Sequence, residues 1–339
     1  MMLFYRAVVI FALLPFLMGL AGCQNYQKQS SSADNATYTA FDSQLHFEVI
    51  SPQSRHDLYD YFLEKNYSWN TLKQGVPPLI VEKFPDDFYG LAAGSERKKI
   101  FFLTLLPMIL LVNEEITVER NALLELFSRH DRNETLNRAE LDQIAAAAHH
   151  YKVKNDPLTD RQARLLLLNR LDKIPPSLAL AQAASESAYG TSRFARLGNN
   201  LFGEMTFNDT DGIMPLNREQ GARHRARVFP TLLDSLRAYI NNLNTHPAYQ
   251  ELRQIRRELQ LRGEVVRGME LARGLELYST RKEAYVDDIR TIIRANNLPK
   301  HTANLSLRRE VIPPSQPVEN PMTKASRQFY GRDDLLSQN

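Results

Sequence analysis

An apolar segment from Lys98 to Ile116 places the strongest constraint on how this chain folds, because its many large aliphatic and aromatic side chains must be covered. Only a membrane or a protein core covers a segment of this kind. We predict a buried core helix and not a membrane span, since the run is short, Pro107 interrupts it, and charged residues flank it closely. Glu114 and Glu115 are then expected to form a solvated pair at the helix end.

The composition indicates a folded protein with a substantial core. The chain has 339 residues, of which 43% are hydrophobic and 24% charged, a length that suits two compact units or one domain with long flanks. A net charge of +3 is too weak to indicate a nucleic-acid partner. Arginines cluster between Arg218 and Arg273, and we interpret them as a solvated helical surface that would also suit an anionic polymer.

The N-terminus is typical of an exported lipoprotein. Arg6 precedes an apolar run from Ala7 to Leu20, which is too short to span a bilayer comfortably and fits a signal peptide. The run ends in Leu-Ala-Gly-Cys23, which resembles a bacterial lipobox, so Cys23 is expected to carry lipid. Cys23 is also the only cysteine, which excludes an intramolecular disulfide. Gln24 resembles the sorting pattern of outer-membrane lipoproteins, so we expect a cell-envelope protein, lipid-anchored in the outer membrane and facing the periplasm.

The rest of the chain divides by composition and periodicity. Amphipathic helices are predicted at 118–130 and 138–151. The expected order is a signal peptide at 1–22, a flexible tether at 23–44, a helical N-terminal region at 45–155, a second domain at 156–298 and a disordered tail at 299–339.

Patterns that would indicate a cofactor or a metal are missing from the sequence. There is no glycine-rich phosphate loop, no His-Glu-x-x-His zinc pattern and no Gly-x-Ser-x-Gly elbow. The segment after Asp131 resembles a calcium loop only faintly, since Leu136 stands where that loop needs glycine. His149 and His150 are adjacent, so they point in different directions on a helix. We therefore expect no cofactor and no metal.

One helix carries a candidate acid. Ser177 follows two prolines and is a plausible N-cap, small residues dominate the segment after it, and Gly190 is a natural stop. Glu186 lies near the C-terminal end of this helix. Burial among small apolar residues and the negative end of the helix dipole are both expected to raise the pKa of its carboxyl. A carboxyl that stays protonated near neutral pH is what a glycosidase uses to protonate a leaving oxygen. Taken alone, the residue is better explained as a buried glutamate paired with Arg193 or Arg196.

The neighbouring sequence favours the acid. The stretches Leu180-Ala-Gln-Ala-Ala-Ser-Glu186 and Thr191-Ser-Arg-Phe-Ala-Arg-Leu-Gly-Asn-Asn-Leu-Phe-Gly203 together resemble the bacterial glucosaminidase family, whose members cut peptidoglycan and share a lysozyme-like fold. The resemblance continues at 227–239, 246–249 and 277–289, and it covers about residues 158–298. The upstream segments 76–80 and 105–116 further resemble the Bax proteins of Gram-negative bacteria, which carry this domain at their C-terminal end.

The resemblance implies roles for individual residues. Glu186 matches the family's general acid. The second carboxylate is expected in a small β-lobe, where Glu219 is the nearest match and Glu204, Asp209 and Asp211 are alternatives. Tyr278 matches a family tyrosine that faces the cleft, where its hydroxyl would bond the N-acetyl group or steady a water molecule; the other interpretation is a half-buried aromatic with a satisfied hydroxyl.

Three further residues are assigned to substrate binding. Tyr189 stands where the family often has tryptophan and would stack on a sugar ring. Asn200 is expected mainly to hold backbone carbonyls around the motif turn, and Phe202 to pack beneath that turn.

The predicted fold is therefore mainly α: a lysozyme-like α+β catalytic domain with a small β-lobe, preceded by a helical region. The predicted function is a peptidoglycan hydrolase that cuts the β-1,4 glycan strand between GlcNAc and MurNAc. Its partners would be glycan strands and, through the lipid, the membrane. A lytic transglycosylase, which uses one glutamate and forms an anhydro sugar, and an inactive peptidoglycan-binding lipoprotein remain alternatives. An amidase is disfavoured, because the sequence offers neither zinc ligands nor a cysteine nucleophile.

Overall fold

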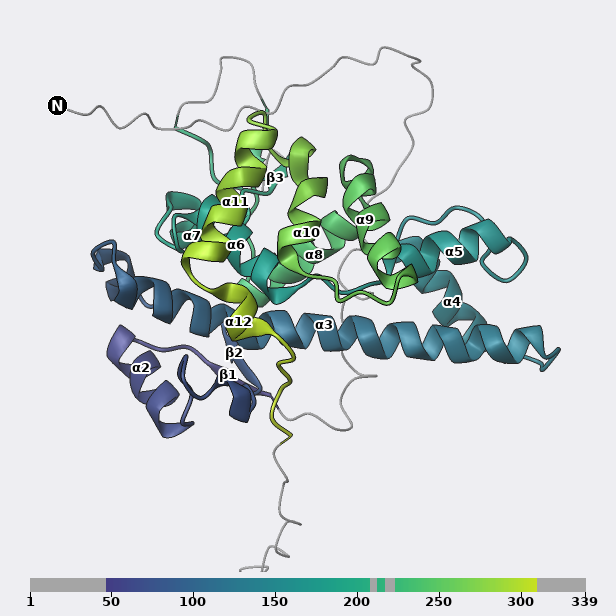
Figure 1. Cartoon of the computed structure of the whole chain (residues 1–339), viewed down its shortest axis with the longest axis horizontal. Helices are drawn as coiled ribbons and strands as arrows, with labels where there is room; N and C mark the ends of the chain where they lie inside the picture. The colour runs from purple at the N-terminus through teal and green to yellow at the C-terminus, as the bar shows by residue number, and fades with distance from the viewer. Residues whose placement is uncertain (1–46, 208–211, 217–222, 310–339) are drawn as a thin grey trace, which may run out of the picture. The chain divides into compact units, whose positions relative to one another are not determined.

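The computed structural model describes residues 47–207, 212–216 and 223–309 (Figure 1). Helices dominate these residues. The α-helices are α2 (Arg55–Glu64), α3 (Ser95–Asp131), α4 (Arg138–His150), α5 (Arg161–Arg170), α6 (Pro176–Ser187), α7 (Arg193–Gly198), α8 (Leu232–Thr245), α9 (Gln250–Leu261), α10 (Gly268–Leu271), α11 (Glu283–Ala295) and α12 (Leu298–Thr302). Short 3-10 helices are η1 (Leu72–Gln74), η2 (Asp86–Gly90), η3 (Pro247–Tyr249) and η4 (Ala272–Tyr278). The prediction of a mainly α fold is confirmed.

Helix α3 is longer than the sequence predicts. The apolar segment and the amphipathic segment at 118–130 form one continuous helix of 37 residues, with Pro107 inside it. Proline cannot donate to the carbonyl four residues earlier, which here is that of Leu103. The buried Tyr67 hydroxyl donates to this carbonyl over 3.0 Å, so the acceptor that Pro107 leaves open is satisfied. A long-range tyrosine contact therefore lets the helix continue through the proline, and the sequence pattern around Pro107 could not show it.

The apolar half of α3 lies in the core, as predicted. Among the described residues it is a helix long and apolar enough to cross a membrane, yet 78% of its most apolar stretch is buried inside the protein. It packs against β2, α6 and α8 (Figure 1). Glu115 does not end the helix as a solvated residue; it accepts a 3.0 Å hydrogen bond from the Arg237 guanidinium of α8.

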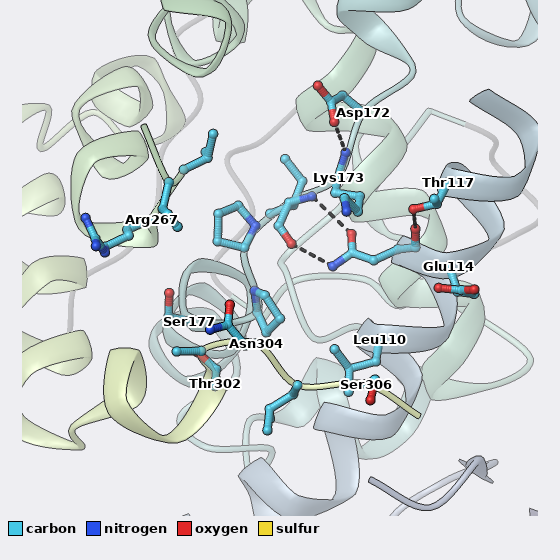
Figure 2. Close-up of a pocket in the computed structure, with 18 of the residues that line it drawn as sticks. Leu110, Glu114, Thr117, Asp172, Lys173, Ser177, Arg267, Thr302, Asn304 and Ser306 are labelled. Carbon is cyan, nitrogen blue, oxygen red and sulfur yellow. Dashed lines mark hydrogen bonds between the residues drawn. The ribbon is translucent and has the colours of Figure 1, made fainter. Parts of the chain in front are cut away.

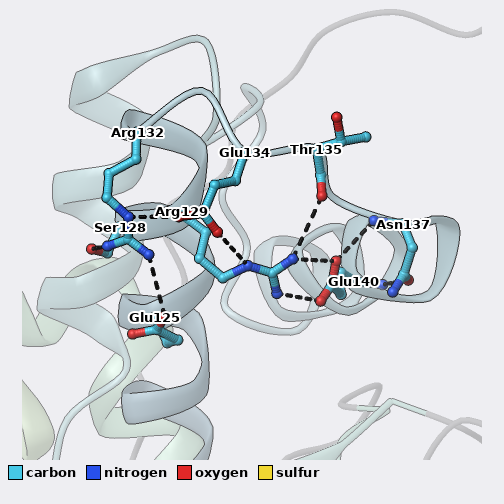
Figure 3. A network of polar contacts seen from close by, with 8 residues as sticks. All are labelled: Glu125, Ser128, Arg129, Arg132, Glu134, Thr135, Asn137 and Glu140. Atoms are coloured by element: carbon cyan, nitrogen blue, oxygen red, sulfur yellow. Dashed lines mark hydrogen bonds and ion pairs between the residues drawn. The ribbon is translucent and has the colours of Figure 1, made fainter.

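The turn from α3 to α4 is closed by ion pairs. Asn137 caps α4 by accepting from the backbone N–H of Glu140, whose carboxylate accepts from the Asn137 N–H in return (Figure 3). The same carboxylate pairs with Arg129 near the end of α3. Asp131 accepts two 2.8 Å bonds from Arg164 of α5. Charged side chains of this turn thus fasten α4 and α5 to the end of α3.

Two pairs of short strands complete the described residues. The first pair, β1 (Glu48–Ile50) and β2 (Leu79–Val81), is parallel, with Val49 opposite Ile80. The second pair, β3 (Met205–Thr206) and β4 (Arg225–Ala226), is antiparallel and is extended by a bridge between Ile213 and Ala226. This second pair is the small β-lobe that the family resemblance implies.

The chain beyond the second predicted domain is folded as far as the structure describes it. Residues 299–309, which the sequence analysis assigns to the tail, contain most of α12 and then run beside residues 65–76. Leu307 forms a parallel bridge with Val76, and the Arg308 guanidinium donates to the carbonyls of Gly75, Lys65 and Asn66. The polar composition of this segment gives no indication of the backbone pairing that holds it against residues 65–76.

Candidate active site

Helix α6 positions the candidate acid. It begins at Pro176, where proline's fixed φ suits the first helical turn, and Ser177 is buried inside that turn and does not cap it. Small residues fill its length, and nearly all of them are fully buried. Because they allow close approach, α6 packs against both α3 and α11. The helix ends at Ser187, with Ala188 as a left-handed C-cap.

Glu186 lies in the last turn of α6 and is half-buried. Burial raises the pKa of its carboxyl to about 7, while a hydrogen bond from Tyr285 and the charge of Arg281 act in the opposite direction. This agrees with the pKa direction expected from the sequence. Gly203, the last residue of the Asn-Asn-Leu-Phe-Gly motif, has a positive φ of 70°, and a Cβ built on it would lie 3.8 Å from Glu186 Oε2. The positive φ favours glycine at this position, and the loop lies in ordinary van der Waals contact with the carboxylate.

A second carboxyl with a raised pKa follows the motif directly. Burial raises the pKa of Glu204 to about 7, opposed by Arg227, whose guanidinium lies 3.5 Å away. Its Oε1 atom is buried and has no hydrogen-bond partner within the described residues. The charges of both Glu186 and Glu204 raise the pKa of Tyr249. The two carboxyls thus lie within electrostatic reach of the same tyrosine.

Asn200 holds the loop that carries Glu204. Its side-chain amide donates to the carbonyls of Glu204 and Arg227, at 2.8 and 2.9 Å, and its carbonyl accepts from the Glu204 N–H at 3.0 Å. The side chain is buried, so solvent does not compete for these hydrogen bonds. This is the structural role expected of Asn200. Phe202 is also buried, and it stacks on Tyr239 with ring centroids 3.8 Å apart.

Buried aromatic residues surround the acid on the side of α8, η3, η4 and α11. Tyr278 and Tyr285 stack with ring centroids 5.3 Å apart, and Tyr249 lies against Tyr278. The Tyr278 hydroxyl donates to the Phe202 carbonyl over 3.1 Å, and this hydrogen bond links η4 to the motif loop. It is Tyr285, and not Tyr278, whose hydroxyl bonds to Glu186. The role expected of Tyr278 toward substrate stays a prediction.

Tyr189 lies between the acid's helix and the N-terminal region. Its half-buried ring makes edge contacts with Phe101 and Phe102 of α3, and the Lys98 ammonium stands 5.2 Å from its centroid. A packing role toward α3 therefore accompanies the sugar-stacking role expected from the sequence. Glu219, Asp209 and Asp211 lie outside the described residues, as does Cys23. Of the second-carboxylate candidates, the structure describes Glu204.

Gln182 and Tyr285 belong to the site although the sequence did not single them out. Gln182 is fully buried on α6, four positions before Glu186 and therefore on the same helix face. That spacing was a usable signal, since a glutamine among alanines needs partners inside the protein. Tyr285 falls inside the matched stretch 277–289, but nothing in the sequence shows that it, and not Tyr278, contacts the acid.

A separate pocket of about 510 Å³ opens at the other end of α6 (Figure 2). Its lining includes Glu114 and Thr117 of α3, Asp172 and Lys173 before α6, and residues 302–307. Neither Glu186 nor Glu204 lines it. Within the part of the chain that the structure describes, no group of three or more His, Cys, Asp or Glu side chains is placed to hold a metal.

Comparisons with known proteins found a matching family and a similar protein. Residues 165–298 match the glucosaminidase family, described as mannosyl-glycoprotein endo-beta-N-acetylglucosaminidase. The chain is 34% identical over 222 residues to Protein bax of Escherichia coli (strain K12), which covers 66% of this chain and 75% of that protein. No solved structure matches the chain. The family match spans α6, the motif loop, the β-lobe and the aromatic residues around Glu186.

Proposed function

Because the chain belongs to the Bax-like glucosaminidase family, we propose that it hydrolyses the glycan strand of peptidoglycan between GlcNAc and MurNAc, with Glu186 as the general acid. The observation that carries the proposal is the setting of Glu186. Its carboxyl is half-buried at a helix end, its pKa is raised to about 7, and Gly203 of the motif loop lies close to it. At neutral pH a large share of these carboxyls is protonated and can donate to the glycosidic oxygen.

The second catalytic group is proposed from two candidates. Glu219 is the nearest match to the family position. Glu204 has a buried carboxylate oxygen without a hydrogen-bond partner among the described residues. Its charge, like that of Glu186, raises the pKa of Tyr249. In an inverting reaction, either carboxylate would activate water on the opposite face of the sugar. If the acetamido group of the substrate attacks instead, neither carboxylate is required as a base.

A digestion experiment tests both assignments. Purified lipid-free protein is incubated with peptidoglycan, and the released ends are identified by mass spectrometry for wild type, Glu186→Gln, Glu204→Gln and Glu219→Gln. Glu119→Gln is the matched control, because Glu119 is another half-buried glutamate with a pKa raised by burial, on α3. We expect reducing-end GlcNAc from wild type and the control, and a loss of at least 100-fold for Glu186→Gln.

The outcomes separate the alternatives. Equal turnover by Glu186→Gln refutes this residue as the acid. Products that have lost water identify a lytic transglycosylase, and absence of any product from wild type contradicts the proposed hydrolysis. Whichever of Glu204→Gln and Glu219→Gln loses activity identifies the base, while retained activity in both supports attack by the acetamido group.

We also propose that Cys23 is lipidated and that the protein is anchored in the outer membrane facing the periplasm. The support is the lipobox-like sequence before Cys23 and the glutamine after it. A labelled fatty acid should be incorporated into the wild-type protein and not into Cys23→Ser, and membrane fractionation should follow the label. Incorporation into Cys23→Ser would contradict this assignment.

A further inference from the structure

A buried chain of three hydrogen bonds leads to the carboxyl of Glu186. The Tyr239 hydroxyl on α8 lies 2.6 Å from Gln182 Oε1, and Gln182 Nε2 lies 3.0 Å from the Tyr285 hydroxyl on α11. Tyr285 in turn bonds to Glu186. Gln182, Tyr239 and Tyr285 are each at most 3% exposed. Water therefore does not compete for these groups, and each bond constrains the next.

The chemistry of these groups fixes the direction of every bond. The carbonyl oxygen of Gln182 can only accept, so the Tyr239 hydroxyl donates to it. The amide nitrogen of Gln182 can only donate, so the Tyr285 oxygen accepts. Tyr285 has a single hydroxyl proton, which is then left for Glu186. Burial raises the pKa of Tyr239 and of Tyr285 far above neutrality, so both phenols keep their protons.

We propose that Gln182 and Tyr239 are positioning residues that aim the Tyr285 hydroxyl proton at Glu186, so that Tyr285 stabilises the carboxylate formed when the acid gives up its proton. The inference rests on the proposed function, because it assigns a use to a carboxyl that donates a proton. Were the Gln182 amide turned over, its oxygen would take the Tyr285 proton and Glu186 would lose its donor. In the orientation that the structure shows, the Tyr239 hydroxyl donates to the Gln182 oxygen over 2.6 Å, so that oxygen faces Tyr239 and the amide nitrogen faces Tyr285.

Other groups also affect the pKa of Glu186, and they determine its value when the Tyr285 donor is removed. Arg281, in the turn between η4 and α11, lowers its pKa and is itself paired with Asp288 at 2.7 Å. The remaining neighbours are neutral phenols whose pKa values the Glu186 charge raises, from η3, η4, α8 and α11: Tyr249, Tyr278, Tyr239 and Tyr285. Without the Tyr285 proton, burial acts against Arg281 alone, and the pKa of Glu186 rises.

The test compares phenol-to-phenyl variants. Tyr285→Phe removes the donor and keeps the ring, and we expect it to raise the pKa of Glu186 by about one pH unit and to lower kcat roughly ten-fold with KM unchanged. Tyr239→Phe and Gln182→Leu should shift the pKa in the same direction by less. Tyr151→Phe is the matched control: this buried tyrosine donates to Glu119 over 3.2 Å, a tyrosine–glutamate pair outside the site.

Two readouts keep this inference separate from the proposed function. The pKa of Glu186 is measured by NMR titration of carboxyl-labelled glutamate in the full chain, with Glu186→Gln to assign the signal, and this needs no substrate. The kinetic profile against pH is measured beside it. An unchanged titration in Tyr285→Phe overturns Tyr285 as the donor, and a shift in Tyr285→Phe with none in Tyr239→Phe or Gln182→Leu overturns the positioning role. A shifted titration in a protein without hydrolase activity supports the donor and refutes only the function.

Discussion

Replacing Gly190 by alanine is expected to destabilise the turn that follows the candidate acid, and by more than an ordinary glycine substitution. Ala188, Tyr189 and Gly190 are three successive residues with positive φ, at 51°, 56° and 81°. Non-glycine residues in this region cost roughly 1–2 kcal/mol each, so the turn persists only because its surroundings hold it. A Cβ added at Gly190 would lie 3.1 Å from ring atoms of both Phe88 and Phe101.

Two terms make up the expected loss. The strain of alanine at positive φ, less the entropy that alanine removes from the unfolded chain, leaves about 1 kcal/mol. Overpacking against Phe88 and Phe101 adds about 1–3 kcal/mol, because each ring stands in a filled core and must move. Gly190→Ala should therefore cost about 2–4 kcal/mol, which corresponds to a fall in Tm of about 4–8 °C for a protein of this size.

Gly263→Ala measures the backbone contribution alone, without overpacking. Gly263 has a φ of 69°, and a Cβ built on it meets no atom within 4 Å. We expect it to lose only about 1 kcal/mol, and to keep whatever hydrolysis the wild type shows. Thermal and urea unfolding of both variants give the difference, and Gly190→Ala combined with Phe101→Leu should recover part of the packing term. Equal losses for Gly190→Ala and Gly263→Ala would refute the close packing of this turn on the N-terminal region.

Three further outcomes are expected. Arg256→Met should cost about 3–5 kcal/mol in urea unfolding, because this fully buried guanidinium donates to several carbonyl oxygens and forms a 3.7 Å ion pair with the Asp172 carboxylate. Arg257→Met on the exposed face of α9 should cost under about 0.5 kcal/mol, and similar losses for the two variants would contradict this prediction. Asn200→Ala should cost about 1–3 kcal/mol by thermal unfolding, since three part-buried backbone groups lose partners, and an unchanged Tm would count against that role. Because burial raises the folded-state pKa of Glu186 and of Glu204 from 4.5 to about 7, their contribution to stability is complete below pH 4.5 and is lost as the pH rises through 7. The urea midpoint should therefore fall between pH 5 and pH 8 more steeply in wild type than in the double glutamine variant, and parallel curves would exclude this.

The sequence predicts the part of the site that is continuous along the chain. Glu186 sits on a small-residue helix with a stop behind it, and its burial and raised pKa follow from that local pattern. The buried Asn200 follows from the motif in the same way. These features depend on neighbours within a few residues, where periodicity and capping rules apply.

What the sequence does not predict depends on contacts between distant segments. Pro107 indicates a break in α3, and only the Tyr67 hydroxyl, 36 positions away from Leu103, shows why the helix continues. Tyr285 reaches Gln182 across 103 positions. A polar group among apolar neighbours indicates that a partner exists, but not which one, because many tyrosines in the chain would satisfy the same need.

The pairing of residues 305–308 with residues 65–76 has a consequence for how the protein is made. The Arg308 side chain donates to the Gly75 carbonyl across 233 positions. The segment around residues 65–76, which is synthesised early, is therefore completed only by a segment that is synthesised late. Contacts of such high sequence separation form late, since the loop that they close is long. During synthesis, the carbonyls of residues 65, 66 and 75 stay without these partners until residue 308 has been translated. The family match ends at residue 298, whereas the chain must be ten residues longer before its N-terminal segment is closed.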